Sequence, residues 1–94
     1  MNPVSLGGTW TAGDSYFTAG HGATLLLHFN AKDVYLVLAG HGTVTATADG
    51  RPAMVIHIAG TPNQHSVLTG TSQHTGQLTI TLSPGLQAYD LTSG

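Results

Sequence analysis

The sequence contains no cysteine, no glutamate and little charge of either sign. Two basic and four acidic residues make up 6% of the 94 residues and give a formal net charge of −2. Without cysteine, the chain has no disulfide, no thiolate zinc site and no thiol nucleophile. Two basic residues cannot neutralise a row of phosphates, so nucleic acid is excluded as a partner, and the same shortage argues against attachment to anionic lipid.

Long apolar runs are also missing. The longest unbroken run is 34–39, far short of the ~18 residues that a membrane-spanning helix needs. The first four residues have neither the basic start nor the apolar stretch of an export signal. We therefore expect one domain, residues 1–94, that does not itself insert into a membrane.

What the sequence has instead is apolar and polar residues that alternate with a period of two. Residues 24–30 predict a half-buried strand with Leu25, Leu27 and Phe29 facing the core. Residues 34–38 are apolar on both faces, which predicts a central strand covered on both sides. Further short strands are expected at 66–68, 78–82 and 86–89, and one or two near Trp10 and Tyr16-Phe17.

The strongest hairpin signal runs from residue 43 to residue 58. Residues 43–48 alternate, Asp49-Gly50 suits a type I′ turn, and Met54, Ile56 and Ile58 return on alternate positions. No window shows helical apolar spacing. Together these patterns predict an all-β, antiparallel, two-sheet jelly-roll sandwich, with a small barrel as the alternative.

Glycine, serine and threonine mark the expected connections. The similar strings at 20–22 and 40–42, Gly-His-Gly in both cases, are interpreted as two turns that need backbone freedom. The stretch 69–76 is expected to be a mobile loop. Lys32 and Arg51 are the only lysine and arginine of the chain. Few charges are therefore present to prevent edge strands of two molecules from pairing, and self-association is plausible.

Histidine is the most unusual residue in the composition, with six in the chain. No two of them lie within five positions of each other, so the common metal-binding spacings are absent. We expect no metal site and no cofactor, and interpret the histidines as weakly polar surface residues. The remaining metal hypothesis is that His28 and His57, both expected on outer strand faces, converge in space.

No pattern in the sequence predicts catalysis. The serines lack the Gly-x-Ser-x-Gly elbow, and no Gly-rich phosphate loop with a lysine is present. The four aspartates stand apart in or beside turns, without the paired carboxylates of a glycoside hydrolase. The chain is therefore expected not to be an enzyme.

Aromatic rings are the remaining candidates for ligand contact, because sugars stack on them. Phe29 shares its face with leucines and is expected in the core. Trp10 is expected to cover the core unless it contacts a ligand. Tyr35 and Tyr89 lie in apolar strands and are expected to be buried with their hydroxyl groups satisfied.

Several strings in the chain are similar to those of a known family, the C-terminal domain of DipZ-type proteins. The family has a membrane-spanning CcdA-like part of the kind used in cytochrome c biogenesis, then a thioredoxin-like domain and then a small β-sandwich. The strings that carry the resemblance cover the chain in order: Gly8-Thr9-Trp10, residues 31–38, Thr43-Val44 leading to Asp49-Gly50, Gly60-Thr61-Pro62 and residues 83–89. Two departures stand out: His65 stands where the family usually has tyrosine, and the ending Leu91-Thr92-Ser93-Gly94 replaces Phe-Thr-Phe-Gly.

The resemblance implies a galactose-binding-like jelly roll, similar to carbohydrate-binding modules, on the extracytoplasmic side of the membrane beside a redox domain. The chain would then be a fragment or stand-alone version of a larger protein's C-terminal domain. The candidate ligand-binding residues are Trp10, Tyr35, His65 and Tyr89. The leading hypothesis is a non-catalytic, carbohydrate-binding-module-like accessory domain that contacts a glycan. The alternative is an interaction domain that packs against a thioredoxin-like neighbour and binds no sugar.

Overall fold

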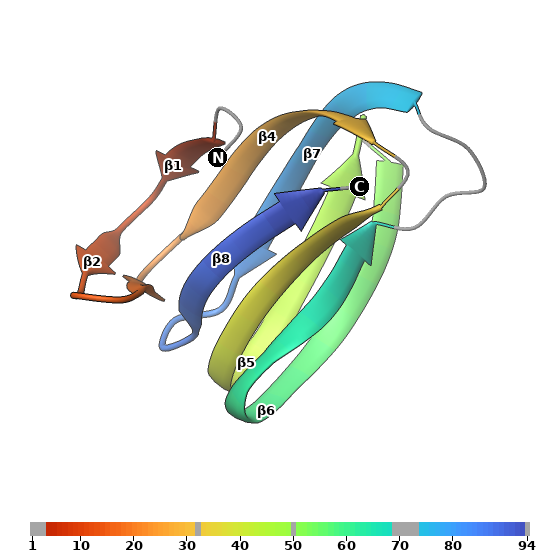
Figure 1. Ribbon diagram of the computed structural model, residues 1–94. Helices are drawn as coiled ribbons and strands as arrows, with labels where there is room; N and C mark the ends of the chain where they lie inside the picture. The colour runs from red at the N-terminus through yellow and green to blue at the C-terminus, as the bar shows by residue number, and fades with distance from the viewer. Residues whose placement is uncertain (1–3, 32, 50, 69–73, 94) are drawn as a thin grey trace.

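The computed structural model describes residues 4–31, 33–49, 51–68 and 74–93, and within these ranges it contains strands and no helix (Figure 1). No helix of this part is therefore long and apolar enough to span a membrane. All strand pairs are antiparallel, as predicted from the alternation. The strands are β1 (Val4–Gly7), β2 (Trp10–Ala12), β3 (Phe17–Ala19), β4 (Thr24–Ala31), β5 (Val34–Ala48), β6 (Arg51–Leu68), β7 (His74–Leu82) and β8 (Gln87–Ser93).

One long hairpin, β5–β6, belongs to both layers of the sandwich. The first part of β5, residues 34–39, pairs with β8, and its last part, residues 44–48, pairs with β7. One layer therefore has the order β1-β4-β7-β5-β6 and the other the order β2-β3-β8-β5-β6. Figure 1 shows β5 and β6 curving together from one layer into the other, which closes that side of the jelly-roll sandwich.

The curve in this hairpin is built on two glycines. Gly40 (φ 103°) is paired with Gly60 (φ 106°), and the register shifts between Leu38 and Gly40. Such φ values are open to glycine and strained for other residues, and a bulge of this kind bends a strand. The prediction of a turn at 40–42 is therefore wrong: the backbone stays in strand β5 and changes layer there. The strands expected at 54–58 and 66–68 are likewise one strand, β6.

The other predicted connections agree with the structure where it describes them. Asp49 has φ 51°, as the first central position of a type I′ turn requires, while Gly50 lies outside the described residues. The predicted turn at 20–22 is present, with Gly22 at φ 66°. Of the loop expected at 69–76, residues 69–73 lie outside the described residues, and 74–76 already belong to β7.

The core lies between the two layers and contains the residues that alternation assigns to it. Leu25, Leu27, Leu36, Leu78 and Ile80 are buried, and no charged or polar residue of the described part is buried. The side chain of Phe29, which was also expected in the core, lies outside the described residues. The inner faces of the two layers thus pack against each other through the core, and each layer keeps one outer face.

The prediction for residues 34–38 is correct for one face of the strand only. Val34, Leu36 and Leu38 are fully buried, and β5 is central as expected. Tyr35 and Val37, on the opposite face, are half-buried and lie on the outer surface of the sheet. Nothing in the described fold covers that surface completely, so its side chains are accessible to a ligand.

Candidate functional site

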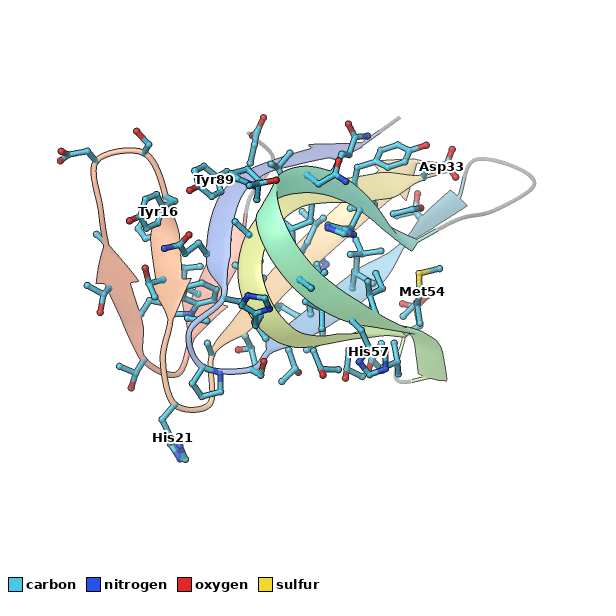
Figure 2. All side chains as sticks on the ribbon, turned by 90° about the horizontal axis from the view of Figure 1, so that it is seen from below. Tyr16, His21, Asp33, Met54, His57 and Tyr89 are labelled. Atoms are coloured by element: carbon cyan, nitrogen blue, oxygen red, sulfur yellow. The ribbon has the colours of Figure 1, made fainter. Side chains whose placement is uncertain are left out.

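All three tyrosines of the chain lie on the outer surface of the layer β2-β3-β8-β5-β6. Tyr35 alternates with the buried residues of β5, and Tyr89 follows the buried Ala88 of β8. Tyr16 immediately precedes β3 and contacts Tyr89 (Figure 2). We define the tyrosine face as the outward residues of this surface: Tyr16, Tyr35, Val37, Gln64, Gln87 and Tyr89.

Tyr16 and Tyr89 form one aromatic unit. Their ring centroids are 5.0 Å apart with an interplanar angle of 40°, within the range of favourable tilted aromatic pairs. Phe17 pairs with Ala88, and the two strands are antiparallel. Tyr16, the residue before Phe17, therefore lies beside Tyr89, the residue after Ala88. Each ring therefore restrains the other, and the pair presents a half-buried aromatic surface.

A bulge in β8 lies at Tyr89, beside the aromatic pair. Val37 pairs with Asp90 and Leu38 pairs with Ala88, so Tyr89 is one extra residue between two pairs. A bulge re-aims side chains in this way and is common beside binding sites. Ala88 faces the core, and Tyr89 and Asp90 can therefore both lie on the outer surface, where strict alternation would turn Asp90 toward the core.

Tyr35 extends the aromatic surface to the next strand. It lies two residues from Val37 on β5, and Val37 pairs with Asp90, the neighbour of Tyr89. Tyr89 lies between the pairs at positions 37 and 38, so two to three residues at ~3.3 Å each and one strand spacing of ~4.8 Å place the two tyrosine backbones roughly 10 Å apart. Tyr16, Tyr89 and Tyr35 thus form a diagonal series across β3, β8 and β5.

Amide side chains frame the aromatic surface. Gln64 pairs with Val37 on β6, and Gln87 pairs with Thr18 on β3 and with Ala39 on β5. The exposed carboxylate of Asp90 is the only charged group beside these residues on β8. The tyrosine face therefore offers rings and amide donors and acceptors, with the carboxylate of Asp90 beside them, which suits an uncharged, hydroxyl-rich ligand.

Two of the four predicted site residues lie elsewhere. Trp10 is half-buried, packs against the core, pairs with the buried Ala19 and donates a hydrogen bond from Nε1 to the Gly7 carbonyl oxygen at 2.9 Å. His65 is half-buried on β6 and pairs with Leu36, whose side chain faces the core. The structure brings Tyr35 and Tyr89 together and separates both from Trp10 and His65, whose ligand contacts stay predictions.

Tyr16 is the tyrosine that the sequence did not single out as a site residue, and Val37, Gln64 and Gln87 were not singled out either. A signal for it exists in the Tyr16-Phe17 pair, because adjacent residues of a strand point to opposite faces. Phe17 pairs with the core-facing Ala88, which places Tyr16 on the outer surface. The partner of Tyr16 could not be found in this way, since Tyr89 belongs to the last strand.

The opposite outer surface, on β1-β4-β7-β5-β6, has a different composition. Thr45 pairs with Thr81 and Thr47 with Thr79, forming uncharged rows of hydroxyl groups without aromatic rings. His57 lies on this side, away from Tyr16 and Tyr89 in Figure 2. This surface therefore supplies control positions for experiments on the tyrosine face.

The hypothesis that His28 and His57 share a metal ion does not fit the register. His28 pairs with Gln77, which bonds to Asp49, whereas His57 pairs with Thr43. Thr43 and Asp49 are six residues apart on one strand, roughly 20 Å at ~3.3 Å per residue, far beyond the reach of one ion. In the part of the chain that the structure describes, no three histidine, aspartate or glutamate side chains are grouped for metal binding.

Comparison with known proteins identifies the family. The model of the family described as "Thioredoxin like C-terminal domain" matches residues 1–94. The chain belongs to this family. It is 37% identical over 94 residues to Protein DipZ of Mycobacterium tuberculosis and to Protein DipZ of Mycobacterium bovis. The match covers 99% of this thioredoxin-like C-terminal domain but only 13% of each relative, so the chain spans a small part of the DipZ proteins.

Solved structures show the same fold in carbohydrate esterases. A family two carbohydrate esterase from Clostridium thermocellum, solved in complex with cellohexaose, superposes with a TM-score of 0.85 at 15% identity. The match covers 98% of this chain and 31% of the esterase. A family two esterase from Cellvibrio japonicus gives 0.84 at 13% identity, over 96% of this chain and 30% of the esterase. At such identities the likeness establishes the jelly-roll sandwich alone.

Proposed function

We propose that this thioredoxin-like C-terminal domain is a non-catalytic accessory domain that binds a glycan on its tyrosine face. The observation that carries the proposal is the gathering of all three tyrosines from three strands onto one outer surface, with Gln64 and Gln87 beside them. The domain would hold a thioredoxin-like redox protein close to a polysaccharide. It would work on the extracytoplasmic side of the membrane, where such polymers lie.

The chemistry of the face suits sugars for a physical reason. A tyrosine ring offers an apolar surface to the apolar face of a sugar ring, and an amide exchanges hydrogen bonds with the hydroxyl groups around it. The restrained Tyr16–Tyr89 pair loses little conformational entropy on binding, because each ring already limits the other. The site is open and shallow, so millimolar to high micromolar affinity is expected rather than tight binding.

The comparisons support the proposal from two sides. The family description connects the domain with thioredoxin-like proteins, and a chain without cysteine must leave thiol–disulfide exchange to another region. The structural likeness to carbohydrate esterases, one of them solved with cellohexaose, shows that proteins containing this fold work on carbohydrates. A soluble β-linked oligosaccharide is therefore a rational first ligand to test.

The test is a titration of the isotope-labelled domain with cellohexaose and with soluble cell-wall oligosaccharides, followed by NMR. Chemical-shift changes are expected at the amides of the tyrosine face and not around His57 on the opposite surface. Tyr89→Ala and Tyr35→Ala are expected to weaken binding about tenfold each, by loss of ~1.3 kcal/mol of ring contact, while His57→Ala leaves it unchanged. No shift at millimolar sugar, or equal losses in all three variants, would reject glycan binding at this face.

A second role, packing against a thioredoxin-like neighbour, is favoured by a separate surface. Leu6 and Phe17 are large apolar side chains that the fold leaves 46% and 45% exposed. Neither belongs to the tyrosine face, so the two roles do not compete for residues.

A further inference from the structure

One lateral side of the sandwich is open. On the closed side, β5 and β6 pass from one layer to the other and carry hydrogen bonds with them. On the other side the layers end in separate edge strands, β1 in one layer and β2 in the other (Figure 1). Core-facing residues on these edges have no further strand to cover them.

Four residues line this open side. Leu6 pairs with the buried Leu25, Trp10 with the buried Ala19, and Phe17 pairs with both Ala12 and the buried Ala88. Paired residues of antiparallel strands share a face, so all four side chains point to the core side of their layers. We call Leu6, Trp10, Ala12 and Phe17 the open-edge stripe.

The exposure of the stripe differs in kind from that of other apolar surface residues. Leu6 and Phe17 belong to the core-facing set and are nevertheless 46% and 45% exposed. Val55, the third exposed large apolar residue of the described part, is 59% exposed but pairs with Thr45 on an outer, solvent-facing surface. Leu6 and Phe17 are thus an uncovered margin of the core, whereas Val55 is a single outward residue.

We propose that the open-edge stripe docks against the thioredoxin-like domain that precedes this domain in proteins of its family. The family description places the domain at the C-terminal end of a thioredoxin-like protein, and the matched region is 13% of the DipZ relatives. A preceding domain would enter through β1, the strand that carries Leu6. From Leu6 to Ala12 the stripe runs along the chain for at most roughly 20 Å, at ~3.3 Å per residue.

A covalent link between the two domains makes so small a surface sufficient for docking. A linked neighbour is present at millimolar effective concentration, so a few apolar side chains can hold it where they could not hold a free partner. Contacts between domains of one chain commonly bury 600–1,500 Å² and are less apolar than obligate interfaces. No charged residue stands among the four stripe residues, which leaves apolar contact as the recognition chemistry.

The test is photo-crosslinking in the intact natural polypeptide. The photoreactive amino acid benzoylphenylalanine replaces Phe17 in one variant and Val55 in the matched control. An intramolecular cross-link from position 17 into a thioredoxin-like region, with none from position 55, is expected. Equal yields at both positions, no cross-link at position 17, or a cross-link from position 17 to a second copy of the chain would overturn the proposal.

A second measurement is independent of ring replacement. Hydrogen exchange at the amides of residues 5–7 and 16–18 is compared between the intact parent and its Leu6→Gln/Phe17→Gln variant, with Val55→Gln as control. At least tenfold faster exchange is expected in the double variant, with Leu27 and Leu78 amides unchanged as evidence of an intact core. Equal exchange in parent and double variant contradicts docking, and neither experiment contains a glycan, so failure here is distinct from failure of the proposed function.

Discussion

Gly42 lies where β5 leaves one layer for the other, and its replacement by alanine tests how that corner is packed. Thr43 N–H donates to Ser83 Oγ at 2.9 Å, and a Cβ at position 42 would collide with that same oxygen. It would also stand 3.1 and 3.3 Å from two carbon atoms of the buried Leu86. A side chain at position 42 is therefore excluded by lack of space and not by backbone strain, because the φ of Gly42 is not in the left-handed region.

The expected destabilisation of Gly42→Ala is ~2 kcal/mol. Displacing the Ser83 hydroxyl costs about 1 kcal/mol for the lost hydrogen bond, and crowding a packed side chain costs about 1–3 kcal/mol. Alanine returns about 0.4–1 kcal/mol by restricting the unfolded chain. Ser83→Ala alone removes the same hydrogen bond and is expected to cost ~1 kcal/mol.

The collision predicts coupling between the two positions. In Gly42→Ala/Ser83→Ala the colliding oxygen is absent and the hydrogen bond is lost only once, so the double variant is expected to be ~1 kcal/mol more stable than additivity requires. Urea unfolding followed by the fluorescence of Trp10, the single tryptophan, measures each free energy. Gly60→Ala is the control, because nothing lies within 4 Å of its Cβ and its cost is strain at φ 106°. Additivity within ~0.5 kcal/mol at positions 42 and 83 would refute this account of the corner.

Three further predictions concern the core, the edge and the histidines. Leu36→Ala removes a fully buried side chain and is expected to cost about 2–5 kcal/mol in urea unfolding, whereas a loss below ~1 kcal/mol would contradict its place between the layers. Trp10→Phe removes the bond to Gly7 and is expected to cost ~1 kcal/mol; calorimetry that finds an unchanged Tm would show that the bond contributes nothing. Zn²⁺ titration followed by calorimetry is expected to give the same weak response for the parent, His28→Ala and His57→Ala, and loss of a tight site in either variant would contradict the separation inferred from the register.

Local pattern predicted most of the fold because it depends on which side chains face the core. Alternation at 24–30 and 78–82 and the Asp49 turn identified strands and a hairpin that the structure contains. The same logic failed at Gly40, because a glycine with positive φ can end a strand or bend it, and the choice depends on its partner Gly60. β1 was not predicted, since four residues on an edge are too few to show a period.

The candidate site could be predicted from the sequence only in part, because it also depends on long-range strand pairing. Tyr35 and Tyr89 were named as candidate ligand-binding residues, but their apolar neighbours also predicted burial, because a local pattern does not reveal that the outer surface of that layer is uncovered. Tyr16 joins them through the β3–β8 pairing, and a bulge keeps Asp90 on the same surface as Tyr89; both are long-range features of the sheet. Trp10, the most obvious ring in the sequence, lies on the core side because it pairs with the buried Ala19, and its indole N–H donates to the Gly7 carbonyl oxygen.

Strand β3 connects the two proposed surfaces through adjacent residues. Tyr16 stands at its start on the tyrosine face, and Phe17 belongs to the open-edge stripe. β3 is joined to β8 by two residue pairs, Phe17 with Ala88 and Thr18 with Gln87, and Ala19 adds backbone hydrogen bonds with Leu86 and Gly85. A glycan that holds Tyr16 and a neighbouring domain that holds Phe17 would both stabilise the same docked β3. Because both would act on the same strand, binding at one surface would be coupled to binding at the other, and the coupling would be reciprocal.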